Sequence, residues 1–220
     1  MPLVMHNTRG TADLEKQILF LLPGNVSTDI KTLWTTLFAF TMEIRQSLAA
    51  MNVYAETIYT GISVPNEQKV LWDLNIQSVW RRLVSDITKV FDKGKTFKKT
   101  NCSVMYLKQI CLQEDHIFQG KEKDPYIIRL DALQQEYERV VTSTIRNKTV
   151  AHHDYDTMRK GKESYIDLND INHLIENLST DIIQLGKRLF NLDFGFPPLN
   201  ELQQQFKKAI VSMITVQENV

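Results

Sequence analysis

The chain has 220 residues, of which 43% are hydrophobic and 24% are charged, so it can bury a core and is not a disordered polymer. Its 26 basic and 26 acidic side chains give a formal net charge of zero, which excludes a histone-like polycation and an acidic tail protein. The two cysteines are too few for a secreted disulfide framework, and no apolar stretch approaches the ~20 residues of a membrane span. We therefore expect a cytoplasmic protein without a membrane segment, organised as one domain over residues 1–220.

Apolar residues recur at three- and four-residue steps along most of the chain, which is the spacing of amphipathic helices. The first predicted helix begins at Thr28 and ends before Gly61 and Pro65. Its apolar stripe consists of Leu33, Leu37, Phe40, Ile44, Leu48 and Met51. A second helix is predicted from about Asn66 to Phe91. Its expected inward face consists of Val70, Leu74, Trp80, Leu83, Val84, Ile87 and Val90.

A basic loop separates this helix from the next, which is short and predicted from Ser103 to Leu112. Asp124 and Pro125 then form the clearest start signal in the sequence. An aspartate cap accepts hydrogen bonds from the free amides of a first turn, and proline at the first helical position loses none. The helix that they open is predicted to reach at least Arg146. Its expected apolar face consists of Ile128, Leu130, Leu133, Tyr137, Val140, Val141 and Ile145.

Two further helices complete the predicted fold. One begins at about Asn169 and is expected to bury Ile171, Leu174, Ile175, Leu178, Ile182, Leu185 and Leu189. The last runs from about Leu199 to Val216, after a loop with Gly195. No segment alternates with a period of two, so no sheet is expected. The sequence therefore predicts an all-α, single-domain helical bundle of about five to six helices.

Most enzyme signatures are missing, including the glycine-rich phosphate loop, the Gly-x-Ser-x-Gly elbow and the His-Glu-x-x-His helix. Cys102 and Cys111 have no histidine at ligand spacing and are expected to be small buried thiols. One dense polar cluster remains, over residues 146–156. A metal site there is disfavoured because adjacent residues point in different directions. The potential ligands are His152, His153, Asp154 and Asp156, and we expect no metal and no cofactor.

The same cluster contains an arginine and a histidine, which together can bind and cleave a phosphodiester. Arginine is a permanently charged fork that matches phosphate oxygens, and histidine passes a proton near neutral pH. Arg146 and His152 are separated by five residues, and Asn147 follows the arginine. In these residues, within Arg-Asn-Lys-x-x-Ala-His-His-Asp, the chain resembles the HEPN superfamily and its abortive-infection, AbiU-like branch. The resemblance includes the segment Trp80 to Asp92 and covers about residues 70–190.

This resemblance implies a metal-independent endoribonuclease that works as a homodimer on RNA. Arg146 would bind the scissile phosphate, His152 would act as general acid or base, and Asn147 would orient the substrate or the histidine. Cleavage would leave 2′,3′-cyclic phosphate ends. The resemblance also implies a role in phage defence or in a toxin–antitoxin pair, with an antitoxin or a nucleotidyltransferase as a possible partner.

Two questions about the site stay open on the sequence. His153 is also at a permitted spacing, and His153 with Tyr155 matches a His-x-Tyr variant of the superfamily. On an ideal helix His153 returns to the face of Arg146, but the Ala-His context favours His152. Asp86 is a candidate to orient the arginine or the histidine, and a cap or salt bridge is the alternative.

The basic loop and the tryptophans have two meanings each. The loop lysines either follow an RNA backbone or form a solvated loop; they are Lys93, Lys95, Lys98 and Lys99. Trp72 and Trp80 belong to the core or to an interface, with base stacking as the alternative. For the whole protein, the alternative to an enzyme is a non-catalytic module that binds a nucleotide, RNA or a protein partner.

Overall fold

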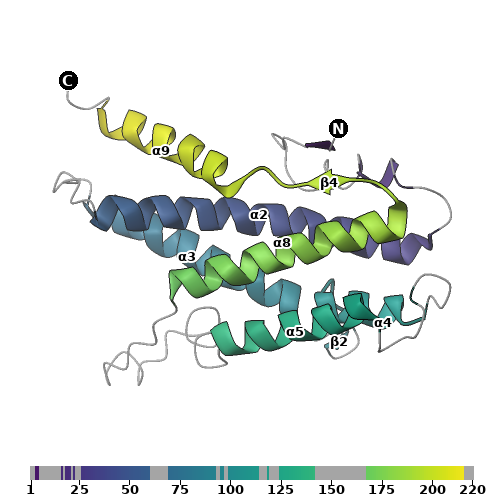
Figure 1. The fold of residues 1–220 in the computed structure, drawn as a ribbon. Coiled ribbons are helices and arrows are strands. Elements are labelled where there is room, and N and C mark those ends of the chain that lie inside the picture. The colour runs from purple at the N-terminus through teal and green to yellow at the C-terminus, as the bar shows by residue number, and fades with distance from the viewer. Residues whose placement is uncertain are drawn as a thin grey trace, which may run out of the picture.

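A computed structural model describes residues 3–4, 16, 18–20, 22, 26–59, 69–92, 95–96, 99–113, 118, 124–141 and 167–215. Within these ranges the protein is an all-α bundle, as predicted (Figure 1). Its helices are α2 (Thr28–Tyr59), α3 (Lys69–Phe91), α4 (Val104–Cys111), α5 (Pro125–Val140), α8 (Leu168–Phe190) and α9 (Leu199–Thr215). Among the described residues, no helix is both long enough and apolar enough to cross a membrane.

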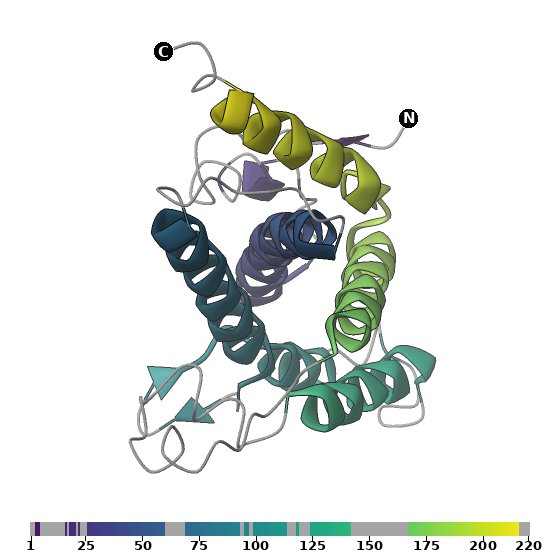
Figure 2. The ribbon, with the colours of Figure 1, turned by 90° about the vertical axis from the view of Figure 1, so that its left-hand side faces the viewer.

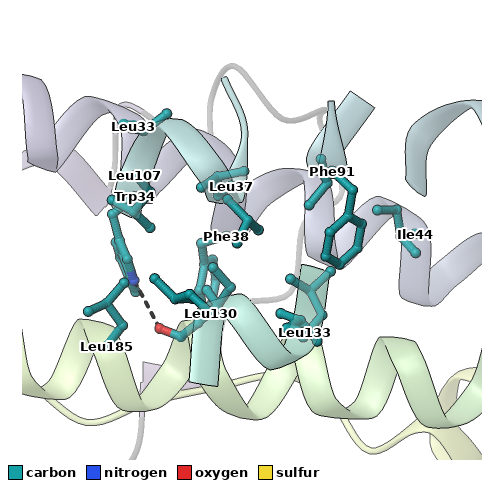
Figure 3. Close-up of a cluster of buried hydrophobic side chains, with 14 of the residues drawn as sticks. Leu33, Trp34, Leu37, Phe38, Ile44, Phe91, Leu107, Leu130, Leu133 and Leu185 are labelled. Atoms are coloured by element: carbon teal, nitrogen blue, oxygen red, sulfur yellow. Dashed lines mark hydrogen bonds between the residues drawn. The ribbon is translucent and has the colours of Figure 1, made fainter. Parts of the chain in front are cut away.

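The long helix α2 forms the centre of the bundle. Figure 2 shows α3 and α8 on either side of it, with α9 and α5 on opposite sides of the molecule. The predicted stripes of α2 and α8 are largely buried, and all seven apolar residues expected on α8 lie in the core. Trp34 is fully buried, and its indole Nε1 donates a hydrogen bond to the carbonyl oxygen of Ile182 at 2.9 Å (Figure 3). The core therefore joins α2 to α8 by packing and by a satisfied polar group.

Side-chain caps fix where several helices begin and end. The carboxylate of Asp124 accepts a hydrogen bond from the Tyr126 amide at 2.9 Å, and Pro125 is the first residue of α5, which confirms the predicted start signal. Asp167 caps α8 in the same way, through the amide of Asn169 at 2.8 Å. At its other end α8 stops at Asn191, whose φ of 53° is left-handed.

Two short strand pairs accompany the helices, although the sequence predicted no sheet. β1 (Leu3–Val4) runs parallel to β4 (Phe194–Gly195), and β2 (Lys95–Thr96) runs antiparallel to β3 (Lys99–Thr100). Each strand has two residues. Such pairs are too short to produce a period-two pattern in the sequence.

The predicted inward face of α3 is wrong in its first half. Val70 and Leu74 are 67% and 56% exposed, as is Leu71 at 64%. No residue from 69 to 82 is buried, whereas Leu83, Val84, Ile87 and Val90 lie in the core as predicted. The first half of α3 carries apolar side chains on both of its sides, and only one side lies against α2.

Helix α5 differs from its prediction in phase and in length. Ile127 is fully buried, and Ile128 is 53% exposed. Because α-helical positions are about 100° apart, residue 127 shares a face with Leu130 and Tyr137, and residue 128 does not. The helix ends at Val140, and Val141 has non-helical angles of φ −106° and ψ 77°. A continuous helix to Arg146 is therefore wrong.

Candidate functional site

Helices α5 and α8 form an antiparallel pair that is joined by polar contacts along its length. Arg129 forms an ion pair with Asp181, and Asn177 Nδ2 donates to Glu136 Oε2 at 2.8 Å. Near the end of α5, Arg139 lies 3.2 Å from Asp170. The end of α5 at Val141 and the beginning of α8 at Asp167 therefore lie near each other, at one end of the bundle (Figure 1).

The predicted catalytic segment connects these two fixed points. Residues 142–166 lie between Val141 and Asp167, and they include all of the candidate motif residues. Arg146, Asn147, His152, His153 and Tyr155 therefore lie outside the described residues. The end of α5 and the beginning of α8 flank this segment and form its frame.

A pair of amides anchors the α8 side of this frame to α2. Asn52 Nδ2 donates to Asn172 Oδ1 at 2.9 Å, and Asn172 Nδ2 donates back to Asn52 Oδ1 at 3.2 Å. Asn172 Nδ2 also donates to the Leu168 carbonyl oxygen in the first turn of α8 at 2.9 Å. The start of α8 is thus fixed to the central helix, as a rigid scaffold for a functional connection requires.

The α5 side of the frame is anchored to α3 by aromatic packing. Tyr137, in the last turns of α5, stacks on Phe91 with ring centroids 4.6 Å apart and planes 8° apart. The Tyr137 hydroxyl is buried and has no hydrogen-bond partner within the described part of the chain. Buried hydroxyls in native proteins are usually hydrogen-bonded, and no sequence pattern distinguishes Tyr137 from the other residues on the apolar face of α5.

Asp86 lies near the end of α3 and is engaged by basic groups close to it. Its carboxylate oxygens lie 2.7 Å from Lys89 Nζ and 3.5 Å from Arg82 Nε, on the same helix. Arg82 also reaches Glu43 of α2 at 3.5 Å. Asp86 thus makes salt bridges, which were the alternative to a role in orienting the arginine or the histidine.

The lysine candidates are only partly described. Lys95 and Lys99 lie in the β2–β3 pair, in which Lys95 is paired with Thr100 and Lys99 with Thr96. Lys93 and Lys98 lie outside the described residues. The β2–β3 pair brings the backbones of Lys95 and Lys99 close together.

The aromatic candidates contribute to packing. Trp80 packs against the core and is half-buried, and Trp72 contacts Tyr54 edge-on with centroids 5.0 Å apart. Burial raises the pKa of the Tyr54 hydroxyl. Of the two cysteines, Cys111 is buried and Cys102 is half-buried, and neither forms a disulfide.

Two carboxylates of α8 and its C-terminal extension have perturbed pKa values of opposite sign. Desolvation raises the pKa of Asp181, and the neighbouring Arg129 offsets part of this effect. A hydrogen bond from Lys187 lowers the pKa of the exposed Asp193. In the described ranges, no group of three or more His, Cys, Asp or Glu side chains is placed to hold a metal ion.

Comparison with known proteins identifies the family. A HEPN-type family model, described as AbiU2, matches residues 35–208, from the first turns of α2 into α9. The match includes the α5–α8 pair and the whole segment between them. No curated protein and no solved structure gives a match. Since the family model covers most of the chain, this protein belongs to the AbiU2 family of HEPN domains.

Proposed function

We propose that this protein is a metal-independent endoribonuclease of the HEPN type that acts in abortive phage infection or in a toxin–antitoxin pair. The observation that carries the proposal is the position of Arg146 and His152 inside the AbiU2 match. Their segment begins at the end of α5 and ends at the start of α8, near which Arg139 and Asp170 lie 3.2 Å apart. Functional side chains on a connection between rigid helices fit this arrangement.

The proposed reaction needs no group from outside the protein and the RNA. The 2′-hydroxyl oxygen attacks the adjacent phosphorus as a histidine removes its proton, and the 5′-oxygen leaves as it receives a proton. Arg146 pairs with the non-bridging oxygens and stabilises the charge that develops on them. His152 is the acid or base, Asn147 orients it or the substrate, and the loop lysines contact the RNA backbone. The products are a 2′,3′-cyclic phosphate and a 5′-hydroxyl.

We further propose a homodimer in which each copy contributes an arginine and a histidine to a shared cleft. Support comes from the exposed side chains of Val70, Leu71 and Leu74, which form an apolar surface on the first half of α3. The first half of α3 lies at the same end of the bundle as the end of α5 and the beginning of α8 (Figure 1). Trp80 and Phe91, in contrast, pack within the fold.

A non-catalytic module that binds RNA, a nucleotide or a partner protein is the second candidate. The observation that favours it is the formal net charge of zero, since 26 basic side chains are balanced by 26 acidic ones. A balanced chain gives little long-range attraction for RNA. An antitoxin or a nucleotidyltransferase would be the expected protein partner.

Cleavage assays with defined substrates separate the two candidates. Purified protein is incubated with a mixed set of labelled RNAs, with and without EDTA, and the fragment ends are identified by mass spectrometry. The enzyme should release 2′,3′-cyclic phosphate ends equally well with EDTA, and a matched all-deoxy strand should stay intact because it lacks the attacking hydroxyl. Complete dependence on a divalent metal, or cleavage of the deoxy strand, would contradict the proposal, and binding of RNA without cleavage would favour the second candidate.

A further inference from the structure

A pocket of about 280 Å³ opens between the beginning of α2 and α4. Helix α2 supplies Asp29, Thr32 and Leu33 to its wall. Its other wall comes from α4 and the two residues that precede the helix cap, and consists of Asn101, Cys102, Tyr106 and Ile110. Ligand pockets start at roughly this size.

Hydrogen bonds hold the α4 wall in place. The fully buried Ser103 caps α4, and its Oγ accepts a hydrogen bond from the Tyr106 amide at 3.3 Å. Asn101 Nδ2 donates to Oδ2 of Asp92, the residue that follows α3, at 3.4 Å. Leu33, at the base of the α2 wall, is 4% exposed and belongs to the core. The pocket is therefore formed by elements that the fold itself fixes.

The described lining of the pocket carries one negative charge. Of the described residues that line it, Asp29 alone is charged, and Thr32 adds a hydroxyl. The beginning of α2 contributes about half a positive charge from its dipole, which the full charge of Asp29 exceeds. On α4, the amine of Lys108 is engaged by Asp131 at 2.5 Å. Among the described lining residues, a phosphate or carboxylate ligand would thus meet a carboxylate and no compensating cation.

Apart from the Asn101 amide, the rest of the described lining is mainly apolar or aromatic. Leu33, Ile110 and Tyr106 provide it, and the half-buried Cys102 also lines the pocket. At about 280 Å³, the pocket has room for a small organic molecule. A ligand with an apolar body of that size and a single cationic head satisfies both the charge and the lining.

We propose that this pocket binds a small organic cation, an ammonium group on an aromatic or aliphatic body, with Asp29 as the partner of its charge. The pocket is distant from the helix ends that flank the proposed catalytic segment, and it adjoins the β2–β3 pair that carries Lys95 and Lys99. Asp29 is at the beginning of α2 and Asn52, which anchors the start of α8, is near its other end. The rise of an α-helix puts roughly 35 Å between them.

Thiol protection tests this site without any measurement of RNA cleavage. 2-Phenylethylammonium, 3-phenylpropionate and 2-phenylethanol serve as cationic, anionic and neutral probes, and mass spectrometry follows alkylation of Cys102. Cys111 is fully buried and provides an internal reference. The ammonium probe should slow alkylation of Cys102 saturably, in the micromolar to millimolar range expected for so small a ligand, and the anionic probe should not.

Two variants connect this protection to the charge of the pocket. Asp29→Asn should weaken protection by the ammonium probe about tenfold, the effect of losing a charged hydrogen-bond partner. The matched variant Asp73→Asn, at an exposed acidic residue of α3, should leave it unchanged. Thr32→Lys, which places a cation in the wall, should reverse the preference towards 3-phenylpropionate. Equal protection by anionic and cationic probes, no saturable protection at all, or an unaffected Asp29→Asn variant would overturn the proposal.

Discussion

Trp34 and Gly186 show how closely α2 and α8 approach each other. The indole ring lies against the helix backbone at Gly186, where an added Cβ would be 2.2 Å from Trp34 Cζ2. Trp34 has no exposed surface and donates to the Ile182 carbonyl, so the ring cannot move aside without losing that bond. Only glycine fits at this position in α8.

Gly186→Ala should destabilise the protein in spite of alanine's higher helix propensity. The propensity gain is about 1 kcal/mol, whereas overpacking a filled core costs about 1–3 kcal/mol or more, and here the clash involves a rigid buried ring. We expect a lower free energy of unfolding in urea. Gly195→Ala is the control, since nothing lies within 4 Å of the added Cβ, and it should stay within about 0.5 kcal/mol of wild type. A Gly186→Ala variant as stable as wild type would contradict this packing.

Asp181 and Asp193 should give the stability opposite dependences on pH. Desolvation raises the pKa of Asp181 above its ordinary value of 3.8, so the folded state holds its proton longer and stability falls as pH rises through that window. Lys187 lowers the pKa of Asp193 below 3.8, so its contribution is present above that pH and is lost as pH falls.

Urea unfolding at several pH values between about 3 and 7 tests this pair, since both ordinary pKa values lie near 4. Asp181→Asn mimics the neutral acid, and its stability relative to wild type should increase with pH. Asp193→Asn should show the reverse trend. Parallel curves for the two variants would mean that the assigned causes of the pKa shifts are wrong.

At the level of single residues, the sequence predicts where a helix lies more readily than which face of that helix is buried. Ile127 and Ile128 are adjacent and chemically identical, and only the phase set by the later residues of α5 distinguishes them. Similarly, nothing local to Val70 and Leu74 indicates that their side of α3 faces outward. Burial depends on which neighbours a helix acquires, and that information is tertiary.

Among the elements, α9 depends on a buried arginine in α2. Arg45 is 4% exposed, and its Nη2 donates to the Pro197 carbonyl oxygen at 3.1 Å, just before α9 begins. Its Nη1 donates to Ser179 Oγ and to Glu176 Oε1, both at 3.0 Å, on α8. The guanidinium also lies 5.5 Å from the centre of the Phe196 ring. One side chain thus joins α2, α8 and the segment that leads into α9.

Arg45→Met should loosen α9 and destabilise the bundle by about 2–4 kcal/mol, because buried acceptors lose their donors. Hydrogen exchange should become faster in residues 199–215 more than in α8. Arg139→Met is the matched control, since its ion pair with Asp170 has a 61% exposed arginine side chain and should contribute at most about 1 kcal/mol. Unchanged exchange in α9 would show that Arg45 does not anchor it.

The elements with strong local signals were predicted well, and the others were not. The caps at Asp124 and the regular stripe of α8 are local features, and both are confirmed. No glycine or proline marks the end of α5 at Val140, so the helix predicted from the sequence extends too far. β1 and β4 are far apart in the chain and two residues long, and no local pattern connects them.

At the scale of the whole molecule, the two ends of the bundle carry different features. The end of α5, the beginning of α8 and the exposed first half of α3 lie at one end of the bundle. The pocket beside Asp29 lies towards the other end. The candidate catalytic motif can be recognised from the sequence because its residues are close together in the chain. The pocket cannot be predicted from the sequence, because residues 29–33 and 101–110 meet only after folding.

The proposed dimer should depend on the apolar surface of α3. A double variant, Leu71→Glu with Leu74→Glu, should raise the dissociation constant at least about a hundredfold, since each buried leucine contributes about 1.5–3 kcal/mol. Light scattering should then give a dimer for wild type and a monomer for the variant. Ile128→Glu, at a 53% exposed residue of α5, is the control and should remain dimeric. A wild-type protein that is monomeric at micromolar concentration would rule out the shared cleft.

RNA cleavage under single-turnover conditions, by wild type and three variants, tests the central claim most directly. Arg146→Ala and His152→Ala should each lower the rate by about 10²–10⁴-fold, the usual loss for a positioned acid–base or charge-stabilising group, with unchanged circular dichroism. His153→Ala should retain much of the activity if His152 is the catalyst, and it should be inactive if the longer spacing is used. Full activity in the Arg146→Ala variant, or no cleavage of any RNA by a well-folded wild-type dimer, would contradict the account.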